Sequence, residues 1–91
     1  MLAGPAVAQE PGSRAQVCAL HDAIAQGLES GWGETQAALG INSAGALVEV
    51  FVSADHTTWS IVVTRPDGWS CIVTVGRDWQ QSHPKPQGTA L

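Results

Sequence analysis

The stretch from Gly45 to Trp79 contains three runs in which apolar and polar residues alternate. Alternation places successive side chains on opposite faces of a β-strand. The runs predict strands over about residues 46–53, 58–65 and 69–76. Because the connections between them are short, the sequence predicts an antiparallel β-meander, which needs a second layer to cover its apolar face.

The turn Arg65-Pro66-Asp67-Gly68 predicts how the last two strands pair. Proline sets φ at the second position of a turn and glycine supplies the left-handed conformation. A type I turn with a glycine bulge places Val63 opposite Cys71 and Ile61 opposite Val73. With this register, one face holds the residues that we expect to form the core: Val48, Val50, Val52, Trp59, Ile61, Val63, Trp69, Cys71, Val73 and Val75.

A helix is predicted before the meander, over about residues 14–29. Its apolar residues recur at steps of three and four and form one stripe. Ser13 and Gln16 fit a capping box at its start. The stripe consists of Val17, Leu20, Ile24 and Leu28. We expect this stripe to pack on the core face of the meander.

The rest of the chain divides around this domain. Residues 1–12 are interpreted as a signal-peptide remnant and lead-in, residues 13–79 as a single domain, and residues 80–91 as a flexible tail without periodicity. Within the domain, residues 32–42 fit either an edge strand from about residue 36 to 41 or a helical turn.

Two cysteines, Cys18 and Cys71, predict one disulfide. Cys71 lies on the expected core face, and Cys18 lies at the border of the helical stripe. We therefore expect the bridge to join helix to sheet. It closes a loop of about 54 residues, which contributes roughly 4 kcal/mol in the chain-entropy account.

The N-terminal residues indicate export. Ala6-Val7-Ala8 fits the small-residue site cut by signal peptidase, and we interpret residues 1–8 as the end of a secretory signal. With the expected disulfide, this predicts a periplasmic protein. No apolar run approaches the roughly 18 residues of a membrane span.

Charge and motifs argue against several classes of function. The net charge is −4, and the four cationic side chains are scattered, so no nucleic-acid partner is expected. No catalytic triad order, phosphate-binding loop or zinc-enzyme motif is present. The histidines His21, His56 and His83 lack the spacing of a zinc site. We expect no enzyme activity, no metal and no cofactor.

Two candidate surfaces remain. The face of the meander turned away from the expected core is unusually apolar and is the candidate contact face for a protein partner or a second copy, as is the strand edge. This candidate face consists of Leu47, Glu49, Phe51, Val62 and Ile72. A small apolar-ligand or glycan pocket between helix and sheet is the alternative, formed by His21, Trp59 and Trp69. A third hypothesis is a small secreted enzyme inhibitor that acts through the loop at residues 53–57.

The order of motifs resembles a loose group of small exported proteobacterial proteins. The resemblance covers about residues 17–79, implies placement in the periplasm and implies no activity. The segments that carry it are Trp32-Gly33-Glu34, Gly45-Ala46-Leu47-Val48-Glu49-Val50-Phe51, Thr58-Trp59, Pro66-Asp67-Gly68-Trp69-Ser70-Cys71 and Gly76-Arg77-Asp78-Trp79.

Together these observations predict an α+β domain. We expect an N-terminal helix packed on a three- to four-stranded antiparallel β-meander with one disulfide. The predicted function is a non-enzymatic periplasmic accessory or protein-interaction module.

Overall fold

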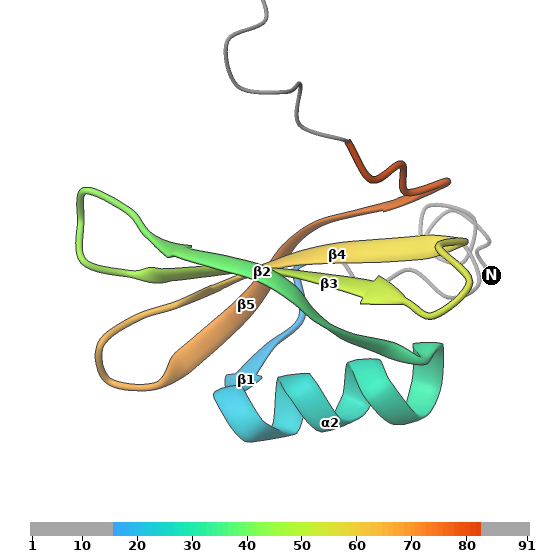
Figure 1. The fold of residues 1–91 in the computed structure, drawn as a ribbon. Helices are drawn as coiled ribbons and strands as arrows, with labels where there is room; N and C mark the ends of the chain where they lie inside the picture. The colour runs from blue at the N-terminus through green and yellow to red at the C-terminus, as the bar shows by residue number, and fades with distance from the viewer. Residues whose placement is uncertain (1–15, 83–91) are drawn as a thin grey trace, which may run out of the picture.

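The computed structural model describes residues 16–82, which form one helix and one five-stranded antiparallel sheet (Figure 1). The elements are β1 (Cys18–Leu20), α2 (His21–Trp32), β2 (Glu34–Ile41), β3 (Leu47–Ser53), β4 (Thr58–Thr64) and β5 (Trp69–Arg77). The strand order is β1-β5-β4-β3-β2. The α+β class is confirmed, although the described sheet has five strands where three or four were predicted. The predicted signal remnant and most of the predicted tail lie outside the described residues.

The meander from β3 to β5 follows the predicted turn chemistry. Gly68 has a φ of 90° and donates its N–H to the Arg65 carbonyl at 2.8 Å. Val63 lies opposite Cys71, as predicted. A register shift beside Ile61 then places that residue opposite Thr74 rather than Val73. The turn therefore determines the pairing near the hairpin, and a bulge changes it by one residue farther along.

The predicted helix was wrong at its start. Residues Cys18–Leu20 form an edge strand that pairs with β5, and α2 begins only at His21. These residues adopt an extended conformation in spite of their helical pattern, because β1 pairs with the otherwise unpaired edge of β5. The predicted disulfide is confirmed between Cys18 and Cys71, but it joins β1 to β5 rather than the helix to the sheet.

The helix ends at a glycine in the left-handed conformation. Gly33 has a φ of 66°, and its N–H donates to the Glu29 carbonyl at 2.9 Å. The chain then enters β2, an edge strand that pairs with β3 and contains a bulge between Gln36 and Ala38. Of the two alternatives for residues 32–42, the strand is therefore confirmed.

The helix covers the face of the sheet that the alternation assigned to the outside. Its buried residues Ile24 and Leu28 pack with Phe51, Val62 and Ile72. Each of the four neighbouring pairs in the sheet is antiparallel, so the two edge strands β1 and β2 run in the same direction. The connection between them, α2, is therefore a crossover from one edge of the sheet to the other. The face on which a crossover lies depends on its handedness, which alternation within the strands does not encode. The expected core face was therefore wrong.

Candidate functional site

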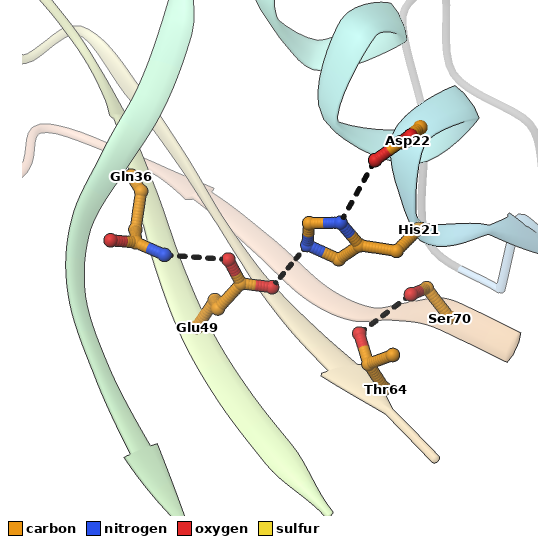
Figure 2. Close-up of polar contacts among 6 residues, drawn as sticks. All are labelled: His21, Asp22, Gln36, Glu49, Thr64 and Ser70. Atoms are coloured by element: carbon orange, nitrogen blue, oxygen red, sulfur yellow. Dashed lines mark hydrogen bonds and ion pairs between the residues drawn. The ribbon is translucent and has the colours of Figure 1, made fainter. Parts of the chain in front are cut away.

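A buried carboxylate lies at the centre of the interface between helix and sheet. Glu49, on β3, is only 1 % exposed. Its Oε1 lies 2.8 Å from Nε2 of His21, and its Oε2 accepts a hydrogen bond of 2.7 Å from the amide of Gln36 (Figure 2). One side chain of β3 is thus bonded to the helix and to the edge strand β2.

The local structure places His21 where it can reach this carboxylate. His21 is the first residue of α2, and its N–H donates to the carbonyl of Gly68 in the β4–β5 turn at 3.0 Å. The imidazole Nδ1 is directed toward Asp22, with 3.7 Å between Nδ1 and Oδ1. A buried carboxylate is costly unless it is paired and hydrogen-bonded. We therefore interpret the group of His21, Glu49 and Gln36 as a tie between α2 and the sheet.

A second buried carboxylate lies farther along the same face. Glu34, the first residue of β2, is fully buried and accepts a 2.7 Å hydrogen bond from the hydroxyl of Ser60. At the other end of the helix, the hydroxyls of Thr64 and Ser70 lie 2.6 Å apart (Figure 2). The covered face therefore combines a small apolar core with hydrogen-bonded polar side chains, which satisfies the rule that buried polar groups are paired.

The predicted contact face is wrong. Glu49, Phe51, Val62 and Ile72 are all buried, and Leu47 is half-buried. Four of these five residues lie under or beside α2 and do not form an exposed surface. The charged Glu49 indicated a solvent-facing side, because carboxylates are seldom buried without a partner. The signal that would have corrected this is the small, hydrogen-bonding character of Ser60, Thr64 and Ser70 on the same face.

The predicted ligand pocket is wrong as well. His21 lies on the helix side of the sheet, whereas Trp59 and Trp69 belong to the opposite face. The two tryptophans lie at opposite ends of the β4–β5 hairpin. Trp59 packs instead against Trp79, with 5.7 Å between ring centroids, and its Nε1 donates to the Arg77 carbonyl at 3.2 Å.

A different cavity lies beside the helix. It has a volume of about 200 Å³ and a mostly apolar lining. Its walls include Ile24, Leu28 and Trp32 from the helix and Ile72 from β5. Trp32 is thus the tryptophan that borders a cavity next to the core.

The face of the sheet opposite α2, here called the open face, has no charged residue within its strands. The charged strand residues are Glu34, Glu49 and Arg77, and the register places all three on the helix side. The register assigns the following residues to the open face: Cys18, Leu20, Thr35, Ala38, Gly40, Val48, Val50, Val52, Trp59, Ile61, Val63, Trp69, Cys71, Thr74 and Gly76. Trp79 covers its Trp59 corner, and no other described element lies over it (Figure 1).

The loop between β3 and β4 is held by its own side chains. The Asp55 carboxylate accepts hydrogen bonds from the Thr57 hydroxyl at 2.7 Å and the Ser53 hydroxyl at 2.9 Å. Hydrogen bonds from the Thr57 side chain, then from the Thr57 N–H and the Ser53 hydroxyl, lower the pKa of Asp55 below its usual range. These carboxylate bonds are used within the loop, which closes a turn where His56 has a φ of 64°.

The turn between β4 and β5 is similar. The Arg65 guanidinium donates to Asp67 at 2.7 Å, and the Trp69 N–H donates to the same carboxyl group at 3.0 Å. The Arg65 hydrogen bond, followed by the Trp69 N–H, lowers the pKa of Asp67. The same contact raises the pKa of Arg65. This exposed ion pair lies at the rim of the open face.

The described residues contain no metal-binding group. In residues 16–82, no cluster of three or more histidine, cysteine, aspartate or glutamate side chains is arranged to hold an ion. Both thiols are in the disulfide. His83, one of the sequence candidates, lies outside the described part of the chain. Nor does that part contain a helix long and apolar enough to cross a membrane.

Comparisons with known proteins identify no relative. No protein-family model, curated protein or solved structure matches the chain. The resemblance to exported proteobacterial proteins therefore stays a prediction, and the function has to be argued from the geometry of the described residues.

Proposed function

We propose that the chain is a non-enzymatic protein-interaction module of the periplasm and that the open face is its binding surface. The strongest support is that the strands present no charged residue on the open face. Within the described residues, only Trp79 packs over this face, at its Trp59 corner. A sheet face exposed to water normally carries alternating polar residues. A contiguous apolar surface on a small domain is typical of a contact site.

The centre of this surface is aliphatic. Val48, Val50, Ile61 and Val63 lie side by side on β3 and β4 and are half-buried by one another. The core on the other side of the sheet is complete without them, because Phe51, Val62 and Ile72 pack against α2. Apolar residues that the core does not need, gathered on one surface, resemble the apolar centre of a protein interface.

The alternatives have less support in the geometry. The cavity beside α2, at about 200 Å³, is smaller than the roughly 300–1,000 Å³ of usual ligand pockets. An inhibitor would present an accessible reactive loop, whereas the polar groups of residues 53–57 are bonded within that loop. The disulfide supports placement in an oxidising compartment, in agreement with a periplasmic role.

Site-specific photo-cross-linking tests the proposal. We would place a photoreactive amino acid at Ile61, on the open face, and at the exposed Gln26, on the outer side of α2, and irradiate cells that export the full chain. Discrete protein adducts from position 61 that are absent from position 26, and that are lost when Val50→Lys is added, are expected. Equal adducts from both positions, or none from position 61, would show that the open face is not a binding surface.

A further inference from the structure

We infer that the occupant of the open face is a second copy of this chain, packed face to face about a two-fold axis parallel to the strands. The inference rests on the proposed function and names the partner of that same surface. Two-fold self-association is the commonest way in which one surface serves as its own partner. Three properties of the open face support it.

The first property is the distribution of charge. Two identical chains of net charge −4 repel each other, and the repulsion is strongest where carboxylates approach closely. All charged residues of the strands lie on the helix side. The charged side chains near the open face include the Arg65–Asp67 pair, which is internally neutralised at its rim. Two copies can therefore meet on this face without opposing unpaired strand charges.

The second property is the relief of the surface. A hollow of about 380 Å³ lies over β2 and β3, where Ala38 and Gly40 leave space beside Val48. At the opposite edge of the sheet, Leu20 and Trp69 project and are 61 % and 40 % exposed. The open face thus has a ridge formed by Leu20 and Trp69 at its β1–β5 edge and a hollow beside Val48 over β2 and β3.

The strand order makes this relief self-complementary. A two-fold axis parallel to the strands reverses the order β1-β5-β4-β3-β2 in the facing copy. The ridge of each copy then lies over the hollow of the other, and the contact occurs twice. An axis perpendicular to the strands would instead place ridge on ridge. The parallel axis is therefore the one that lets both surfaces close.

The third property is the available area. Five strands spaced about 4.8 Å apart, each with roughly seven residues at about 3.3 Å, give a face of about 550 Å² per copy. Two such faces bury roughly 1,100 Å² in total, which is near the lower limit of specific interfaces. We therefore expect a reversible dimer rather than an obligate one.

The oligomeric state of the full chain tests the inference. Sedimentation equilibrium over a wide concentration range should show an equilibrium between 9.5 kDa and twice that mass. Added salt should strengthen the dimer, because it screens the repulsion between like-charged copies. A single 9.5 kDa species at protein concentrations up to about 100 μM would overturn the inference. A dimer that dissociates when salt is added would overturn it as well.

Variants locate the interface. Ile61→Lys places a charge at the centre and should raise the dimer dissociation constant by more than about tenfold. The milder Val50→Thr should raise it by about threefold to tenfold with the fold intact, and Gln26→Lys, on the outer side of α2, serves as the matched control. Circular dichroism verifies that each variant folds. Equal dissociation constants for Val50→Thr and Gln26→Lys would contradict the proposed interface.

Cross-linking distinguishes this inference from the proposed function. A photoreactive amino acid at Trp69 should form adducts of twice the chain mass, with the linkage mapped to residues 34–48 of the second copy. Adducts of other masses would refute self-association while leaving the interaction module in place. Linkage to residues 1–15 or 83–91 of the same chain would show that the chain covers its own open face, which refutes both.

Discussion

Replacement of His21 by alanine should destabilise the fold through the buried carboxylate of Glu49. The substitution removes the 2.8 Å contact between Nε2 of His21 and Oε1 of Glu49. The carboxylate, 1 % exposed, keeps its bond to Gln36 but has one oxygen without a protein partner. Leaving a buried acceptor unsatisfied costs about 1–3 kcal/mol. The His21 side chain is itself 32 % exposed, so water that replaces the ring places the expected loss in the lower half of that range.

The effect is measurable by urea unfolding with the disulfide intact. At an m-value near 1–2 kcal/mol per molar urea, the midpoint should fall by about 1 M. The matched control is Gln26→Ala, because Gln26 is an exposed residue of the same helix and lies away from the Glu49 carboxylate. It should change stability by less than about 0.5 kcal/mol.

A double-mutant cycle separates the pair from its surroundings. Glu49→Leu alone leaves the imidazole and the Gln36 amide without their acceptor, whereas combining it with His21→Leu removes the buried charge and its partner together. The combined loss should be smaller than the sum of the two single losses by at least about 1 kcal/mol. Two results would refute the tie between helix and sheet. One is a free energy of unfolding for His21→Ala within about 0.5 kcal/mol of the wild-type value. The other is a double variant whose stability loss equals the sum of the losses of Glu49→Leu and His21→Leu.

Three further predictions concern other parts of the domain. Replacing both disulfide cysteines by serine opens a loop with a sequence separation of 53 and should lower the free energy of unfolding by roughly 4 kcal/mol. Thermal unfolding of this variant, and of the wild type with and without reductant, would measure the loss. A melting temperature equal to that of the oxidised wild type would contradict it. Gly76→Ala should displace the indole of Trp59, which a β-carbon at Gly76 would overlap, so the near-ultraviolet dichroism from its packing with Trp79 should change while the far-ultraviolet spectrum does not. The hydrogen bonds that lower the pKa of Asp55 stabilise the fold at pH values above 3.8, and this stabilisation is lost as the pH falls through the lowered pKa. The difference in melting temperature between wild type and Asp55→Asn should therefore shrink as the pH falls below 3.8. A difference that is constant with pH would refute the role.

Much of the sheet could be predicted because its signals are local. Period-two alternation located β3, β4 and β5 to within about a residue, since it depends only on the geometry of an extended chain. The Pro66-Asp67-Gly68 turn correctly placed Val63 opposite Cys71. The disulfide also followed, because only one pairing of two cysteines is possible.

The candidate site could not be predicted in the same way. The group of His21, Glu49 and Gln36 unites three elements separated by up to 28 residues, and no spacing rule relates them. The open face was assigned to the core because it contains more aliphatic side chains than the face that α2 covers. Both faces are apolar enough to be buried, so composition alone does not choose between them.

Patterns along the chain were enough to predict the strands of the meander, the main turn, the disulfide and the division of side chains into two sets on opposite faces. Each of these depends on neighbours along the chain or on a unique pair. Which of the two sets is covered follows only from the three-dimensional arrangement, because it depends on the crossover from β1 through α2 to β2. The same is true of the strand Cys18–Leu20, since only the unpaired edge of β5 makes an extended conformation favourable there. The open face that we propose as the binding surface is a consequence of those two tertiary choices.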